Sequence, residues 1–283
     1  MFKSAFLLFC ILFIIKIESY SQLPAFEKIR VNVPVDDLVF TRAIMDINGY
    51  IWLGSEKGLY RFDGINFKSF YPETDSAEFH VTALFEDEDR MLWIGCKDGS
   101  IFKFDEGKIV PFSPEEGTAN QPVTDILVSV DRTLWWSTAG EGIYFYSGGK
   151  VYNINHDDGL PDDYVYDLEN SLDGTVWAGT DGGVVSCLFR GGKKIVTKLA
   201  ASVTLPDIMV TVIKEDEEGN LWLGFQEGGA GFLVPDRSDF LSPAPGQMQD
   251  TGPINDITIT DGSAWIGTAT GKLFEIKRSG REI

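Results

Sequence analysis

Basic residues are scarce in this sequence. Lys and Arg together number 24, against 43 Asp and Glu, which gives a formal net charge of −19. The electrostatic field of such a negative charge repels polyanions. The densest basic stretch, residues 190–194, lies in a Gly-rich segment that we expect to be solvated surface. We therefore expect no nucleic-acid partner, and highly sulfated glycans are poor ligand candidates.

The motifs of common catalytic sites are also missing. The sequence has no Gly-x-Ser-x-Gly elbow, no His-Glu-x-x-His and no phosphate loop. Its two histidines, His80 and His156, give little support to a metal site. The acidic stretches 86–89, 157–158, 162–163 and 216–218 have neither the separation of glycosidase carboxylates nor EF-hand spacing, and turns explain them better. We expect no enzyme activity, no metal and no cofactor.

Long apolar runs are limited to the amino terminus. The run from Ala5 to Ile15 follows Lys3 and is shorter than the ~20 residues that span a bilayer. Ser19 and Ser21 supply the small residues that a signal peptidase reads. We predict that residues 1–21 are a signal peptide cut before Gln22. The mature chain, 22–283, would then be exported, into the periplasm, and would contain no membrane span.

A tryptophan recurs six times at nearly constant spacing. The steps between successive tryptophans are 41, 42, 42, 45 and 43 residues, for Trp52, Trp93, Trp135, Trp177, Trp222 and Trp265. A period near 42 accommodates four short strands and is typical of a propeller blade. We expect these six rings to be structural and to pack between successive sheets, because a buried indole covers a large area.

Each period contains the signals of a four-stranded antiparallel sheet. In the second and fifth periods an apolar run such as 81–85 leads to an acidic, Gly-containing turn such as 216–219, which suits a hairpin. The Trp strand and two further alternating strands follow, as in 59–62 and 66–70. The sequence therefore predicts an all-β fold, a β-propeller of six four-stranded blades over residues 22–283.

The last repeat supplies only three strands, at 254–258, 263–267 and 272–276. Phe26–Val31 alternates like an outer strand, and we predict that it closes the sixth blade, since closure hides sheet edges. The alternative is that these repeats are part of a larger propeller. Cys96 and Cys187 belong to blades that are not neighbours, so we expect two buried, unpaired thiols.

The repeat pattern Asp-x-x-Gly-x-Leu-Trp-Ile-Gly-Thr-x-x-Gly-Leu resembles the two-component regulator propeller repeat. The resemblance covers residues 37–277. It is strongest in the first repeat, at 49–64, and in the fourth, where 159–161 and 164–168 resemble the inter-blade linker, and it departs at Trp136-Ser137. It implies an exported sensor region like those of bacterial hybrid histidine kinases. It also implies a glycan or small-molecule ligand and a protein partner in a two-component system, because the sequence carries no kinase segment.

Two other functions stay open. Streptogramin lyases are also propellers with Trp- and Gly-rich repeats, and that resemblance would imply a catalytic histidine with carboxylates and a divalent metal. His80 and His156 are the two histidines available. The other alternative is a protein–protein interaction scaffold.

Candidate ligand contacts come from two sets of loops that share one propeller face. The loops between blades supply Phe40, Phe79, His80, His156, Asp158 and Tyr164. The loops after the Trp strands supply Glu56, Lys57, Lys97, Asp98, Glu141, Asp181, Gln226 and Glu227. Carboxylates and aromatic rings suit hydroxyl-rich sugars, although each residue alone is more typical of solvated surface. Trp136 is outside the repeat register and faces the other way from Trp135; it is either a second packing layer or a ligand contact.

Overall fold

The computed structural model describes residues 38–73, 79–114, 117–171, 173–199, 203–234, 239–243, 248, 250–260 and 263–277. The chain divides into two units, Met1–Asn32 and Val33–Ile283, and every described residue belongs to the second. The predicted signal peptide and closing strand therefore lie outside the described residues.

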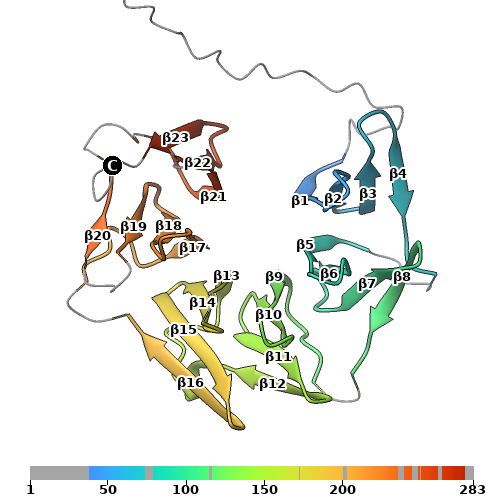
Figure 1. The fold of residues 1–283 in the computed structure, drawn as a ribbon, viewed down its shortest axis with the longest axis horizontal. Coiled ribbons are helices and arrows are strands. Elements are labelled where there is room, and N and C mark those ends of the chain that lie inside the picture. Colours follow the sequence, from blue (N-terminus) through green and yellow to red (C-terminus); the bar gives the residue numbers. More distant parts are fainter. Residues whose placement is uncertain are drawn as a thin grey trace, which may run out of the picture. The chain divides into compact units, whose positions relative to one another are not determined.

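The described residues form six antiparallel sheets (Figure 1). The first three are β1 (Phe40–Met45), β2 (Ile51–Ser55), β3 (Gly58–Phe62) and β4 (Phe67–Phe70); β5 (Val81–Glu86), β6 (Leu92–Cys96), β7 (Ile101–Asp105) and β8 (Lys108–Phe112); and β9 (Val123–Val128), β10 (Leu134–Thr138), β11 (Ile143–Ser147) and β12 (Lys150–Ile154). The last three are β13 (Val165–Asn170), β14 (Val176–Thr180), β15 (Gly183–Arg190) and β16 (Lys193–Lys198); β17 (Val210–Glu215), β18 (Leu221–Phe225), β19 (Ala230–Leu233) and β20 (Phe240–Leu241); and β21 (Ile254–Thr260), β22 (Ser263–Thr268) and β23 (Leu273–Lys277).

Each sheet is a meander whose strands follow chain order, and the first strand of each lies innermost (Figure 1). Successive inner strands contact one another from β1 through β5, β9, β13 and β17 to β21. The predicted six-bladed β-propeller is therefore confirmed. Helix is limited, within the described ranges, to one 3₁₀ turn, η1 (His156–Asp158).

Five blades share one tight turn between their first and second strands. It begins at Asp46, Asp87, Ser129, Ser171 and Asp216, whose backbone N–H donates to the carbonyl four residues later. The fourth turn residue has a positive φ, which is unstrained in glycine, as at Gly219. In blades 2 and 3 this position is arginine, at φ values of 66° and 68°, so the repeat tolerates a strained residue there.

The acidic turn residue also anchors the tryptophan. Asp46 Oδ2 accepts a hydrogen bond from Trp52 Nε1 at 2.9 Å, and Asp216 Oδ2 accepts one from Trp222 Nε1 at 3.0 Å. The other oxygen of each carboxylate accepts backbone N–H groups of the same turn. The turn aspartate thus satisfies a buried indole and closes its own hairpin, which explains its position six residues before the tryptophan.

The glycine two residues after the tryptophan is required by the next blade. A Cβ at Gly95 would lie 2.5 Å from Val123 Cγ1, and one at Gly224 would lie 2.5 Å from Ile254 Cγ2. Any side chain would therefore push the neighbouring inner strand away. Blade 3 has Ser137 here, fully buried, with its hydroxyl 2.8 Å from that of Thr124.

The cores lie between successive blades. Cys96 and Cys187 are both buried free thiols in separate core clusters, and burial raises the pKa of each to about 12. Blade 5 ends in the two-residue strand β20, and blade 6 has three strands in the part of the chain described here.

Candidate ligand-binding site in the central cavity

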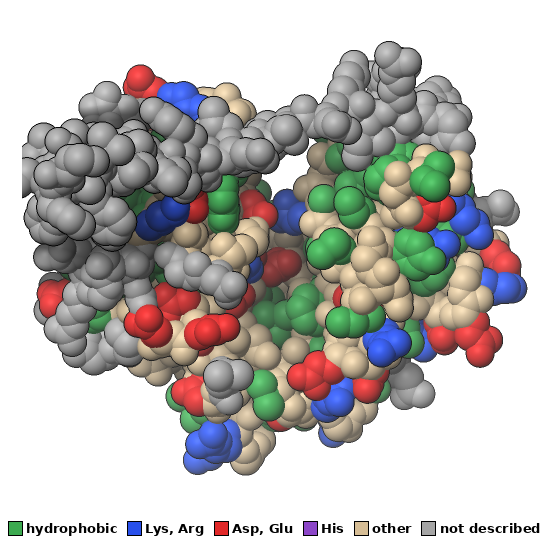
Figure 2. All heavy atoms as spheres, turned by 45° about the horizontal axis from the view of Figure 1, so that its top comes forward, with side chains coloured by type: hydrophobic (Ala, Val, Ile, Leu, Met, Phe, Trp, Pro, Cys, Tyr) green, Lys and Arg blue, Asp and Glu red, His purple; other side chains and the backbone are tan. Residues whose placement is uncertain are grey.

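The inner strands line a cavity of 1120 Å³. Its lining includes residues of β1, β5, β9, β13, β17 and β21, so every blade contributes. Figure 2 shows the hollow from an oblique direction, with acidic and basic side chains inside it. The volume slightly exceeds the range of small-molecule sites, roughly 300–1,000 Å³.

One side of the cavity is apolar. It is formed by half-buried Ile44 and Phe85 and by buried Leu127, from blades 1, 2 and 3. Phe85 packs against the cores on both sides of blade 3. This side offers a surface on which the flat face of a ligand ring can lie.

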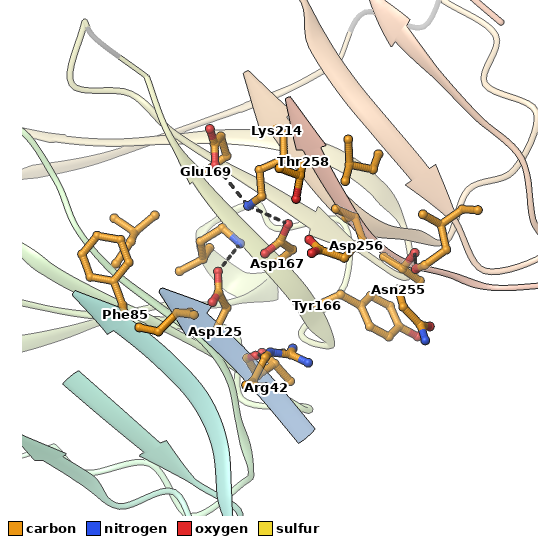
Figure 3. A pocket seen from close by; sticks show the side chains of 18 of the residues that line it. Arg42, Phe85, Asp125, Tyr166, Asp167, Glu169, Lys214, Asn255, Asp256 and Thr258 are labelled. Atoms are coloured by element: carbon orange, nitrogen blue, oxygen red, sulfur yellow. Dashed lines mark hydrogen bonds and ion pairs between the residues drawn. The ribbon is translucent and has the colours of Figure 1, made fainter. Parts of the chain in front are cut away.

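The other side carries charge. Lys214 on β17 points toward β13, where its Nζ lies 3.3 Å from Glu169 Oε2 and 3.5 Å from Asp167 Oδ2 (Figure 3). Asp125 on β9 and Asp256 on β21 are also part of the lining. An ammonium group with carboxylates around it therefore sits on the wall of the cavity.

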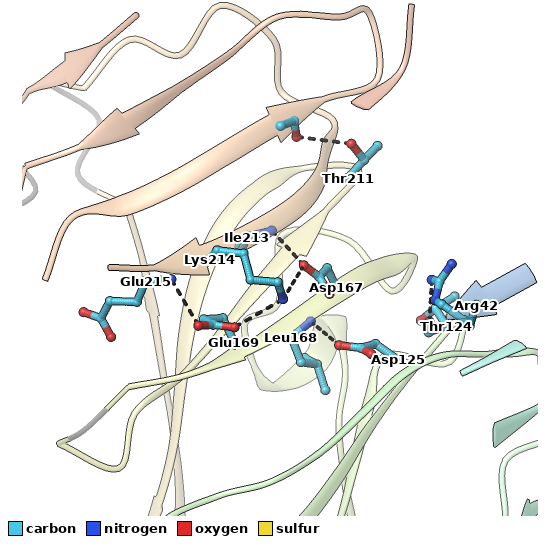
Figure 4. A network of polar contacts seen from close by, with 11 residues as sticks. Arg42, Thr124, Asp125, Asp167, Leu168, Glu169, Thr211, Ile213, Lys214 and Glu215 are labelled. Atoms are coloured by element: carbon cyan, nitrogen blue, oxygen red, sulfur yellow. Dashed lines mark hydrogen bonds and ion pairs between the residues drawn. The ribbon is translucent and has the colours of Figure 1, made fainter. Parts of the chain in front are cut away.

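Three of these carboxylates, those of Asp125, Asp167 and Glu169, connect blades 3, 4 and 5 (Figure 4). Asp125 Oδ2 accepts the Leu168 N–H at 3.0 Å, and Asp167 Oδ2 accepts the Ile213 N–H at 2.8 Å. Glu169 Oε1 accepts a third backbone N–H, from β17, at 3.1 Å. Each carboxylate thus binds the inner strand of the next blade and holds its own position in doing so.

Burial shifts the ionisation of this group. Desolvation, followed by the charge of Asp167, raises the pKa of Asp125 well above its usual value. Desolvation also raises the pKa of Glu169. Desolvation alone would lower the pKa of Lys214, but Asp167, Glu169 and Asp125 outweigh it, so that pKa is raised and the lysine stays charged.

Arg42 and Tyr166 also line the cavity (Figure 3). Arg42 donates to the carbonyl oxygens of Thr41, at 3.1 Å, and Thr124, at 3.0 Å, which joins blades 1 and 3. The Tyr166 hydroxyl donates to Asp181 Oδ1 at 2.6 Å. Desolvation and this bond raise the pKa of Tyr166.

The two predicted sets of loops do lie on one face. In every blade, a backbone N–H just after the Trp strand donates to a carbonyl just before or at the start of the inner strand. Examples are Lys97 to His80, Asp181 to Tyr164 and Gln226 to Met209. This repeated bond joins the two sets around the mouth of the propeller.

Of the predicted contacts, Gln226 alone is among the described lining residues of the cavity. Glu141 accepts a hydrogen bond from the Tyr144 hydroxyl on β11, and Asp181 accepts one from the Tyr166 hydroxyl on β13. The others lie outside the described lining. Phe40 begins β1, His156 and Asp158 belong to η1, and the loops carry Glu56, Lys57, Phe79, His80, Lys97, Asp98, Tyr164 and Glu227. His80 and His156 are on different inter-blade loops, and the described residues include no cluster of three or more His, Cys, Asp or Glu suited to a metal.

Trp136 lies in a second packing layer. It is 2% exposed, stacks on Tyr144 with ring centroids 5.6 Å apart, and packs among residues of blades 2 and 3. Trp135 points to the opposite side, into the next core, where its Nε1 donates to Ser129 Oγ. Position 136 therefore fills the space between blades 2 and 3.

The charged wall itself was missed by reasoning from sequence. A sequence feature that could have predicted it is an ionisable residue within the first apolar run of a repeat. Examples are Asp167 and Glu169 in 165–170 and Lys214 in 210–215. Only the circular arrangement shows that these positions face a common space.

No protein-family model and no curated protein sequence matches this chain. Solved structures do resemble it. One is the extracellular domain of BT4673 from B. thetaiotaomicron, described as a one-component system, with a TM-score of 0.67 and 23% identity over 84% of this chain and 34% of that one. Another is the extracellular domain of BT3049 from the same organism, described as a hybrid two-component system, with a TM-score of 0.68, 20% identity and coverage of 84% and 33%.

Virginiamycin B lyase from Staphylococcus aureus is also similar, with a TM-score of 0.70 and 13% identity over 87% of this chain and 83% of the lyase. All these identities are low, so the likeness establishes a shared propeller fold. The resemblance to regulator propellers is confirmed at that level. The chain spans about a third of the length of the two extracellular domains, and the helices of the described residues include none long and apolar enough to cross a membrane.

Proposed function

We propose that this chain is a ligand-binding propeller of the sensor type, exported to the periplasm, and that a carbohydrate or another small molecule binds in its central cavity. The observation that carries the proposal is the cavity itself, to which all six blades contribute and which has one apolar and one charged side. Such a combination gives a ligand both contact area and orientation. The signal would pass to a protein partner of a two-component system.

The lyase alternative finds no catalytic candidate in this cavity, because neither His80 nor His156 is among its described lining residues. The interaction-scaffold alternative predicts a response to a protein and none to small molecules, so a ligand screen separates it from the proposal.

The screen is a thermal shift of the purified chain against neutral, basic and acidic oligosaccharides, followed by titration calorimetry of each hit. A ligand that binds the native state raises the melting temperature as its concentration passes the Kd. Thr258 is exposed and lines the cavity, whereas exposed Thr260, two residues later on β21, does not. We expect Thr258→Trp to abolish binding of the hits and Thr260→Trp to leave it unchanged. Hits that bind Thr258→Trp at full affinity would contradict a cavity site, and a chain that responds to no small molecule would contradict the function.

A further inference from the structure

The cavity wall carries more acidic than basic side chains. Among its described residues are five carboxylates and two basic groups, and these residues are Asp125, Asp167, Glu169, Glu215, Asp256, Arg42 and Lys214. A surplus of negative charge in a confined, partly desolvated space repels anions and attracts cations, because the low dielectric strengthens each interaction.

Both basic side chains are already engaged. Lys214 is shared between Asp167 and Glu169, and Arg42 donates to two backbone carbonyls. The positive charge of the wall is therefore held in fixed places, and Lys214 does not reach Asp256 in any hydrogen bond or ion pair seen among the described residues.

Asp256 is the acceptor left over. It is exposed to the cavity, its side chain points inward from β21 (Figure 3), and no described residue pairs with its carboxylate. A second acceptor lies on the same lining, because Asn170 Oδ1 is buried and has no hydrogen-bond partner among the described residues. A buried acceptor without a donor, such as Asn170 Oδ1, costs about 1–3 kcal/mol. Exposed Asp256 adds a carboxylate that no described residue pairs with, so this wall favours a ligand that supplies donors and positive charge.

We propose that the ligand carries a primary amine, and that its ammonium group binds the carboxylate of Asp256 on the charged side of the cavity. This inference rests on the proposed function and specifies its ligand class. An ammonium brings three donors and no acceptor, and its bonds to a carboxylate are charge-assisted. Among carbohydrates, the class corresponds to sugars with free amino groups.

The protein already shows this chemistry with its own side chain. The ammonium of Lys214 is held in the same wall by two carboxylates at 3.3 and 3.5 Å. A ligand amine at Asp256 would place a second ammonium on this wall, at a carboxylate that pairs with no cation among the described residues.

The test compares three β-1,4-linked trisaccharides that share a backbone and differ at the 2-position, namely the trimer of glucosamine, its fully N-acetylated form and cellotriose. Titration calorimetry is done at about pH 6, where amines that titrate near about 7.7 are protonated. We expect the glucosamine trimer to bind at least about tenfold more tightly than the acetylated trimer, the ratio that one charge-assisted bond supplies.

Asp256→Asn should remove about tenfold of the affinity for the glucosamine trimer and leave the weak binding of the neutral trimers unchanged. Asp157→Asn is the matched control, since Asp157 is an exposed aspartate in η1 away from the cavity. Thr258→Lys is a second variant at an exposed position, which places a competing ammonium on the lining and should also weaken binding of the amine.

Two outcomes would overturn the inference. One is a neutral trimer that binds as tightly as the amine, and the other is an Asp256→Asn variant with unchanged affinity for the amine. If Thr258→Trp still abolishes binding of the neutral trimer, either result rejects the amine as the ligand class and retains the cavity as the binding site. Failure of every small molecule in the screen rejects both.

Discussion

The turns that hold the tryptophans and the inner strands around the cavity belong to the same repeats, but they vary in different ways. In four blades the residue six positions before the tryptophan, Asp or Ser, accepts the indole N–H. The fifth residue of the inner strand, in contrast, is Phe85 in blade 2, Glu169 in blade 4 and Lys214 in blade 5. The residues that recur from repeat to repeat therefore serve blade packing. The residues that differ between blades make one side of the cavity apolar and the other side charged.

The largest expected effect falls on the turns. Asp216→Ala leaves the Trp222 indole and two backbone N–H groups of the turn without their acceptor, and we expect a loss of about 2–3 kcal/mol in the free energy of unfolding. Ser129→Ala in the equivalent turn of blade 3 removes a neutral acceptor and should cost about 1 kcal/mol. Urea unfolding measures both. Equal losses would show that the charge of the turn aspartate is unimportant.

An intermediate effect is expected in the charged wall. Lys214→Met leaves Asp167 and Glu169 without their shared cation. Breaking a fully buried pair costs about 3–5 kcal/mol; because the Lys214 side chain is 31% exposed, we expect about 1–2 kcal/mol.

Lys103→Met is the matched control for this loss. Lys103 pairs at 3.7 Å with Asp105, whose side chain is 44% exposed, and such surface pairs contribute about 0–1 kcal/mol. A Lys214→Met variant no less stable than Lys103→Met would contradict a structural role for the charged wall.

The smallest expected effect is a gain in thermal stability, at Asp125. The pKa of Asp125 is raised by burial, so the folded state resists its ionisation, and the stability present below about pH 4 is lost as pH rises through the raised pKa. Asp125→Asn keeps an acceptor for the Leu168 N–H and avoids this loss. We expect its melting temperature to exceed that of the wild type by about 2–4 °C at pH 7 and to match it below about pH 4.

The opposite sign is expected at Asp63. Backbone N–H groups of Asn66 and Ile65 lower the pKa of this exposed turn carboxylate, so its ionised form stabilises the fold above the ordinary aspartate pKa. Asp63→Asn should therefore lower the melting temperature at pH 7, with the difference disappearing as pH falls. An Asp125→Asn variant that is also destabilised at pH 7 would contradict the burial argument.

The fold could be predicted because its signal is local and repeated. Trp222, the Asp216 turn and Gly224 recur in register, and each meets a short-range demand, namely an indole acceptor, a hairpin and a close approach of the next blade. The shared face of the two loop sets also follows from the order of strands. The cavity lining did not follow, because Asp125, Glu169 and Lys214 are more than forty positions apart in successive repeats and meet only across blades.

The sequence by itself determined a six-bladed propeller, since the hydrophobic period and the turn chemistry are properties of neighbouring residues in the chain. It also determined the overall acidic charge. Only the tertiary structure decided that Lys214 lies between Asp167 and Glu169, that Trp136 is buried and that Asp256 faces the cavity without a described partner. The physical reason is that charge pairing and desolvation depend on distance in space, and the closing of blades around an axis sets those distances.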